Sequence, residues 1–158
     1  MSEPNCQFME EAISQALNSV NSGKGGPFGA VIVKGGKIVA KAHNQVTLTN
    51  DPTAHAEIVA IRRACQALGT FQLRGCELYT SCEPCPMCFG AIYWARLDRV
   101  YYASTKEDAA AIGFDDRWIY EELEREPLLR QLPASQFMGD EALVAFQVWA
   151  EASNKIEY

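Results

Sequence analysis

The stretch that decides the fold reads C-E-L-Y-T-S-C-E-P-C-P-M-C and runs from Cys76 to Cys88. Its first part, Cys76–Ser81, predicts a short strand, which ends before the two prolines that follow in the same stretch. The pair Cys85-Pro86 then predicts the start of a helix, because proline suits the first helical turn. Apolar residues continue that helix as far as Trp94. A strand that runs directly into a helix is typical of layered α/β domains.

The segments on either side extend this pattern. Apolar residues between 8 and 20 have helical spacing, and Gly35-Gly36 between two β-branched runs predicts an antiparallel hairpin. We expect Asp51-Pro52 to open a further helix, with Asp51 as its cap. The remaining predicted elements are one strand and two helices, at Arg99–Ser104, Trp118–Glu126 and Glu141–Ser153. The predicted fold is an α/β layered domain with a mixed sheet.

Composition indicates one soluble domain that covers residues 1–158. Hydrophobic residues make up 48% of the chain and charged residues 22%, which is typical of globular proteins. We expect no membrane association, because no apolar run is long enough to span a bilayer. The N-terminus does not resemble a secretory signal. We therefore expect a cytoplasmic location, where six cysteines stay reduced and a cysteine cluster indicates metal binding or catalysis.

The net charge of the chain bears on whether the protein binds nucleic acid. The formal charge is −6 and the isoelectric point is near 4.9. Tight binding of nucleic acid usually needs a basic surface that displaces counterions. We therefore expect no nucleic-acid partner.

Three residues have the chemistry of a catalytic zinc site. His55, Cys85 and Cys88 offer one imidazole nitrogen and two thiolates, which Zn²⁺ prefers in tetrahedral sites. Cys85 and Cys88 lie one helical turn apart, and His55 lies near the start of another predicted helix. If the strands before these helices run parallel, both helix starts meet at one edge of the sheet. Three protein ligands leave a fourth position for water, which zinc activates at neutral pH.

Glu57 is the candidate proton carrier. It lies two residues after His55 and can lean over the metal-bound water without ligating the metal. A carboxylate in that place can take a proton from the water and pass it on. H-x-E followed by P-C-x-x-C is the signature of zinc deaminases.

Other interpretations of the cysteines stay open. If Cys82 also bound zinc, the site would be closed, and the protein would be a zinc-stabilised binding module without catalysis. Pro84 separates Cys82 from the helix, so we expect Cys82 to be a small buried thiol at the end of the strand. We expect His43, the other of the chain's two histidines, to lie at the end of a strand and not to bind metal.

Six blocks resemble the cytidine deaminase-like superfamily of zinc hydrolases and, more closely, the bacterial guanine deaminases. Three of them are shared with other purine-acting relatives, including tRNA adenosine deaminases: G-G-P-F-G-A-V-I-V-K (25–34), N-D-P-T-A-H-A-E (50–57) and Y-T-S-C-E-P-C-P-M-C (79–88). Three point to guanine deaminases: G-A-I-Y-W-A-R (90–96), G-F-D-D (113–116) and N-K-x-E-Y (154–158). The resemblance implies a three-layer α/β/α fold with a mixed central sheet.

The resemblance also implies an activity, namely hydrolysis of guanine to xanthine and ammonia. It makes His55, Cys85 and Cys88 the zinc ligands and Glu57 the proton shuttle. It implies that the base is held by Asn44, the backbone of Ala56 and the ring of Phe28, with Asp116 as a second acid. It further implies a homodimer that exchanges a C-terminal segment of about residues 130–158, so that Trp94 and Tyr158 complete the site of the other subunit.

Alternatives within this chemistry remain. A tRNA adenosine deaminase performs the same reaction on a flipped nucleotide, and other aminopurines or aminotriazines have a similar shape. Asp115 could cap the following helix, and Asp116 could share that role. Phe146 and Trp149 have helical spacing, and we expect them to pack in a core or across a dimer interface.

Overall fold

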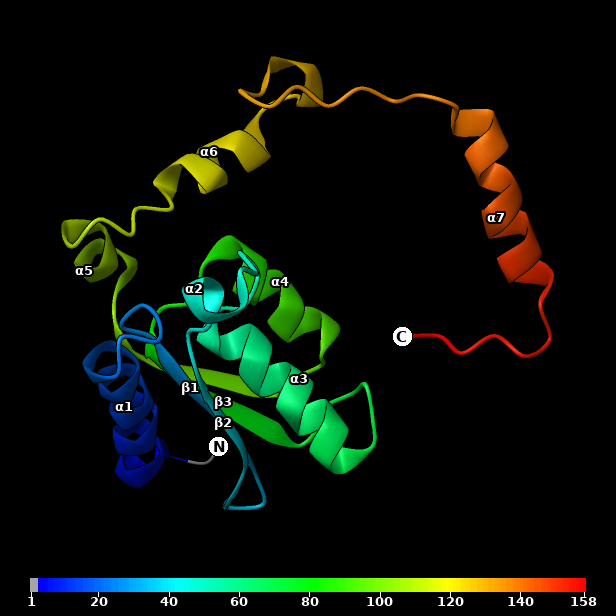
Figure 1. Ribbon diagram of the computed structural model, residues 1–158. Helices are drawn as coiled ribbons and strands as arrows, with labels where there is room; N and C mark the ends of the chain where they lie inside the picture. The colour runs from blue at the N-terminus through cyan, green and yellow to red at the C-terminus, as the bar shows by residue number, and fades with distance from the viewer. Residues whose placement is uncertain (1–2) are drawn as a thin grey trace. The chain divides into compact units, whose positions relative to one another are not determined.

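The computed structural model describes residues 3–158 (Figure 1). It divides into two compact units. The first ends at Asp116 and the second comprises Arg117–Tyr158. Within the described residues, no helix combines the length and apolar character that a membrane crossing requires.

The first unit contains the predicted succession of helices and strands. Its elements are α1 (Cys6–Asn21), β1 (Gly29–Lys34), β2 (Lys37–His43), α2 (Val46–Thr49), α3 (Ala56–Leu68), β3 (Cys76–Cys82), α4 (Pro86–Trp94), β4 (Arg99–Ser104) and α5 (Lys106–Ala111). The hairpin turn lies at Gly35 and Gly36, which both have positive φ, as a type I′ turn requires. The short helices α2 and α5 were not predicted from the sequence, because each has too few residues to show a period.

One predicted helix start is wrong. The sequence predicted that the second helix opens at Asp51-Pro52, but α3 begins at Ala56 with His55 in the capping position. The Asp51 carboxylate instead accepts hydrogen bonds from the backbone and hydroxyl of Thr53, at 2.8 and 2.6 Å. Asp51 therefore stabilises a turn before the helix. This shift places His55 at the helix N-terminus, where its side chain can point away from the helix.

The sheet is mixed, as predicted, and its strand order within the described residues is β2-β1-β3-β4. β1 pairs antiparallel with both β2 and β3, while β3 and β4 are parallel. β2, β3 and β4 therefore run in the same direction, and their carboxyl ends lie at one edge of the sheet. The residues that follow these strands meet there, as is usual for ligand sites in α/β proteins.

Helices cover both faces of this sheet and make three layers, which confirms the fold class (Figure 1). Ala30 and Ile32 of β1 contribute to the core that contains α3 and α4 residues. Val31 and Val33 contribute to a second core with Ala12 of α1. Alternate residues of one strand thus serve opposite faces, as the period of a β-strand requires.

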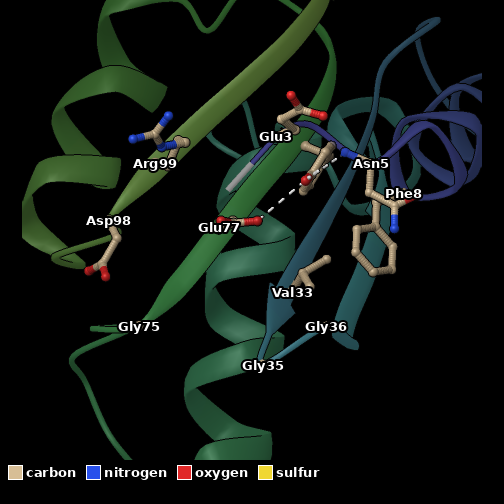
Figure 2. A pocket seen from close by; sticks show the side chains of 11 residues that line it. Glu3, Asn5, Phe8, Val33, Gly35, Gly36, Gly75, Glu77, Asp98 and Arg99 are labelled. Atoms are coloured by element: carbon tan, nitrogen blue, oxygen red, sulfur yellow. Dashed lines mark hydrogen bonds between the residues drawn. The ribbon is translucent and has the colours of Figure 1, made fainter. Parts of the chain in front are cut away.

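A cavity of about 850 Å³ lies at the opposite edge of the sheet, where β3 and β4 begin (Figure 2). Glu77, Asp98 and Arg99 line it together with the ring of Phe8. The Tyr79 hydroxyl donates to the Glu77 carboxylate at 3.3 Å and accepts from the backbone N–H of Asn5 at 3.2 Å. This cavity is far along β3 from the predicted metal ligands.

The second unit contains α6 (Arg117–Glu124), a short 3₁₀ helix at Pro127–Leu129 and α7 (Gly139–Glu151). These agree with the predicted helices to within two residues, apart from the 3₁₀ turn. None of the three helices has a buried side chain. The exposed apolar side chains of this unit are Trp118, Leu123, Leu128, Leu129, Leu132, Phe137, Met138, Leu143, Val144, Phe146, Val148, Trp149 and Ile156.

Candidate metal centre

His55, Cys85 and Cys88 come together at the carboxyl edge of the sheet. His55 precedes the first turn of α3, Cys85 precedes that of α4, and Cys88 lies within that turn. Their ligand atoms all lie within 4.8 Å of one another. Each thiol sulfur is 3.5 Å from Nδ1 of His55. Both helices begin here because the preceding strands run in the same direction, which is the arrangement that the sequence predicted.

The electrostatics of the cluster favour a bound cation. Hydrogen bonding from Cys88, together with His55, lowers the pKa of the Cys85 thiol to about 4. The hydrogen bond with Cys85, followed by burial, raises the pKa of Cys88. The Cys85 thiolate raises the pKa of His55. One imidazole nitrogen and two sulfurs are a donor set that fits Zn²⁺.

Glu57 lies beside the cluster, in the first turn of α3. Its side chain is only 6% exposed. One carboxylate oxygen is 3.5 Å from the Cys88 sulfur and the other is 3.5 Å from the Thr80 hydroxyl. Burial raises the pKa of this carboxyl group. The structure therefore places an acidic group next to the ligands, at a position suited to proton transfer.

Cys82 has a different environment from the two cysteines that follow it. It is the last residue of β3, is buried, and donates a hydrogen bond to the carbonyl of Thr105 at 3.5 Å. Burial raises the pKa of its thiol to about 11. The group of potential ligands in the described residues does not include it. This is the buried thiol at the strand end that the sequence predicted.

Polar groups from two further segments reach the same edge. Asn44 directly follows β2, and its side-chain oxygen accepts hydrogen bonds from the N–H groups of Gly26 and Val46, at 3.3 and 3.2 Å. Its NH₂ group has no partner among the described residues, although the residue is only 6% exposed. The N–H of Ala56 is one of the first in α3 and also has no partner in the described part of the chain.

An aromatic pair adjoins these polar groups. Phe28 immediately precedes β1, and its carbonyl accepts a hydrogen bond from the N–H of Asn44 at 2.9 Å. The ring of Phe114 meets the ring of Phe28 edge to face, with centroids 4.9 Å apart. Sequence reasoning missed Phe114. Its only signal in the sequence is its place in the G-F-D-D block, beside the candidate acid Asp116.

The other predicted site residues are Asp116, Trp94 and Tyr158. Partial burial, and then the negative charge of Cys85, raise the pKa of Asp116. Trp94 ends α4, is 64% exposed, and lies 6.0 Å from the guanidinium of Arg96. Tyr158 belongs to the second unit. His43 is outside the cluster and contacts Asn44 instead.

Comparison with known proteins identifies the family. Residues 2–104 match the sequence profile of the cytidine and deoxycytidylate deaminase zinc-binding region. The chain belongs to this deaminase family. Family membership makes it a zinc-binding hydrolase, and the cluster of His55, Cys85 and Cys88 fits the zinc site.

Guanine deaminases and tRNA-specific adenosine deaminases are both similar to this chain. The chain is 55% identical to the guanine deaminase of Bacillus subtilis over 151 residues, which are 96% of this chain and 97% of that protein. The X-ray structure of that guanine deaminase superposes with a TM-score of 0.95 and covers 99% of both chains. The tRNA-specific adenosine deaminase of Aquifex aeolicus is 45% identical over 97 residues, 61% of this chain and 64% of that protein.

Proposed function

We propose that the protein is a zinc-dependent guanine deaminase that hydrolyses guanine to xanthine and ammonia. The observation that carries this proposal is the three-ligand cluster with the buried Glu57 carboxylate beside it. The match to a guanine deaminase over 151 residues also includes most of residues 117–158. Matches to tRNA deaminases are shorter, so they give less support to that alternative.

Zinc, when bound, supplies hydroxide at neutral pH by lowering the pKa of a coordinated water to about 7. His55, Cys85 and Cys88 would hold it. Glu57 accepts the proton of the attacking water and returns it to the base, because its carboxylate is the acidic group that lies against the ligands. The buried Thr80 hydroxyl, 3.5 Å from this carboxylate, helps to orient it.

Asn44 and Ala56 supply the polar recognition of the base. Because the Asn44 side-chain oxygen already accepts two backbone hydrogen bonds, only its NH₂ group is left to face a ligand. The Ala56 N–H is a second donor. Both donors therefore select acceptors, such as a carbonyl oxygen or an unprotonated ring nitrogen of a purine. The ring of Phe28 offers an apolar face to the flat base.

Asp116 provides the second proton path. The leaving amine must gain a proton, and Glu57 carries one proton at a time. Partial burial is the largest cause that raises the pKa of Asp116, so its carboxyl group holds a proton more readily than that of a free aspartate. We assign this acid to the amino group of guanine.

Product analysis tests the substrate. Purified protein is incubated separately with guanine, with the aminotriazine ammeline and with an anticodon stem-loop that contains adenosine. We expect xanthine and ammonia from guanine and no inosine in the RNA, because a formal charge of −6 disfavours a polyanion. Turnover of the RNA alone would replace this proposal with tRNA deamination. Faster turnover of ammeline would make the aminotriazine the substrate.

We further infer that the protein is a homodimer, and that about residues 130–158 are exchanged so that each subunit completes the domain of the other. The exposed apolar side chains of α7 support this, because a surface of this kind normally packs against a protein partner. Trp94 and Tyr158, which are 64% and 70% exposed, would complete the partner's purine site.

Deleting Asn154–Tyr158 tests the tail. We expect kcat/KM for guanine to fall by about tenfold or more, because the substrate loses part of its enclosure, whereas zinc content stays at that of the full chain. Mass measurement in solution reports the dimer in parallel. Unchanged kinetics would remove Tyr158 from the site.

We also propose where in the cell the enzyme acts. Six cysteines, two of them zinc ligands, work best in a reducing compartment, so we place the enzyme in the cytoplasm. There it would act on free guanine in purine breakdown, without a nucleic-acid partner.

A further inference from the structure

We propose that His43 is a positioning residue, which acts through Asn44 and holds its NH₂ group toward the substrate. The inference rests on the proposed function, because it names a residue that supports base recognition. His43 is the last residue of β2, and Asn44 follows it at the carboxyl edge of the sheet.

Nearly every polar group of Asn44 is already committed. Its backbone N–H donates to the Phe28 carbonyl at 2.9 Å. Its side-chain oxygen accepts from two backbone N–H groups. Its backbone carbonyl accepts from the Ser19 hydroxyl at 3.4 Å and from Nδ1 of His43 at 2.7 Å. The His43 contact is the shortest of these, so it contributes most to holding the carbonyl.

The chemistry of this contact fixes the role of the imidazole. A carbonyl oxygen only accepts hydrogen bonds, so Nδ1 of His43 must carry the proton. This is true of both the neutral ring with hydrogen on Nδ1 and the cationic ring. The bond therefore does not require a particular charge on His43.

The other side of the Asn44 carbonyl is closed by backbone. A Cβ atom at Gly25 would collide with this carbonyl oxygen. The carbonyl thus lies between the Gly25 backbone, the Ser19 hydroxyl and the His43 ring.

Removing the His43 bond leaves the weak Ser19 contact as the remaining hydrogen bond to this carbonyl among the described residues, and the peptide is then held mainly at its other end, where the Gln45 N–H donates to the Ala54 carbonyl at 2.9 Å. The Asn44 backbone, from which the side chain projects, gains freedom to tilt about that bond. Preorganised polar groups lose binding energy when they are allowed to move.

Three substitutions of His43 separate the Nδ1 bond from packing. The amide nitrogen of asparagine is as many bonds from Cα as Nδ1 of histidine, whereas that of glutamine is one bond further. We expect His43→Leu and His43→Gln to raise KM for guanine by about tenfold with little change in kcat, the result of losing one hydrogen bond. His43→Asn should retain the wild-type KM to within about threefold.

A double-mutant cycle shows whether His43 acts through Asn44. Asn44→Ala removes the side chain that His43 is proposed to orient, so His43→Leu should cause no further rise in KM in that background. Val39→Ala is a matched control, because Val39 is a partly buried residue of the same strand that packs on the core. It should lower thermal stability and leave KM unchanged.

Three results would overturn the proposal. These are an unchanged KM in His43→Leu, a His43→Asn variant as impaired as His43→Leu, and an effect of His43→Leu that persists fully after Asn44→Ala. Failure of the proposed function is distinguishable, because the wild-type protein would then release no ammonia from guanine. The same variants would then be compared on the substrate that it does convert.

Discussion

The two ends of β3 differ in what they offer a ligand. At the carboxyl end, the chain leads into Cys85 and Cys88, and nearby donors of Asn44 and Ala56 have no partner among residues 3–158. At the amino end lies a cavity of about 850 Å³, but the Tyr79 hydroxyl beside it is already hydrogen-bonded to Glu77 and Asn5 (Figure 2). Volume alone therefore does not indicate a site. Convergent ligands and unpaired donors do.

The difference arises from strand direction. Because β2, β3 and β4 end at the same edge, their following loops bring side chains from distant parts of the sequence together. Those loops also lead into α3 and α4, whose first turns have N–H groups without intrahelical partners. The opposite edge receives the hairpin turn, the starts of β3 and β4 and the first turn of α1, whereas α3 and α4 begin at the carboxyl edge.

We expect the largest effect from a pair of substitutions that changes one carboxylate near each end of β3. Glu57→Gln should lower kcat for guanine by about 10²- to 10⁴-fold, because the amide cannot carry the proton. Zinc content, measured by mass spectrometry of the metal, should stay equal to that of the wild type. Glu77→Gln at the other end is the matched control and should leave kcat unchanged. Full activity of Glu57→Gln would show that another group moves the proton.

We expect a smaller effect on kcat from substitutions of Thr80, which contacts Glu57. Thr80 is 1% exposed, and its hydroxyl lies 3.5 Å from both the Glu57 carboxylate and the Gly29 carbonyl. Thr80→Val keeps the shape and removes the hydroxyl, so we expect kcat to fall by about threefold to tenfold. Thr80→Ser should recover most of this loss. If Val and Ser behave alike in steady-state kinetics, the hydroxyl has no part in orienting Glu57.

The smallest effect on turnover is expected at Tyr79, the residue before Thr80, which faces the other side of the sheet. Tyr79→Phe removes the hydroxyl that binds Asn5 and Glu77. The free energy of unfolding should fall by about 1 kcal/mol in chemical denaturation, since one set of hydrogen bonds is lost. We expect kcat and KM to be unchanged. A marked loss of turnover would mean that the two ends of β3 are coupled.

Much of the fold could be predicted because its signals are local. Gly35-Gly36 between β-branched runs identified the hairpin, and Cys85-Pro86 identified the start of α4. The predicted start of α3 at Asp51 failed because aspartate caps turns as readily as helices, and here its carboxylate binds Thr53. A sequence pattern cannot distinguish these two uses of one side chain.

By itself, the sequence determined the identity of the donor atoms. His55, Cys85 and Cys88 offer the imidazole nitrogen and the thiolates that Zn²⁺ prefers, and the spacing of the two cysteines predicts that they lie on one helical turn. Only the tertiary structure decided which neighbours these donors have. It excludes Cys82 from the cluster, brings Phe114 onto Phe28, and turns the Asn44 oxygen toward backbone N–H groups. These contacts join residues far apart along the chain or depend on a single side-chain rotation, so sheet register and packing decide them, not local spacing.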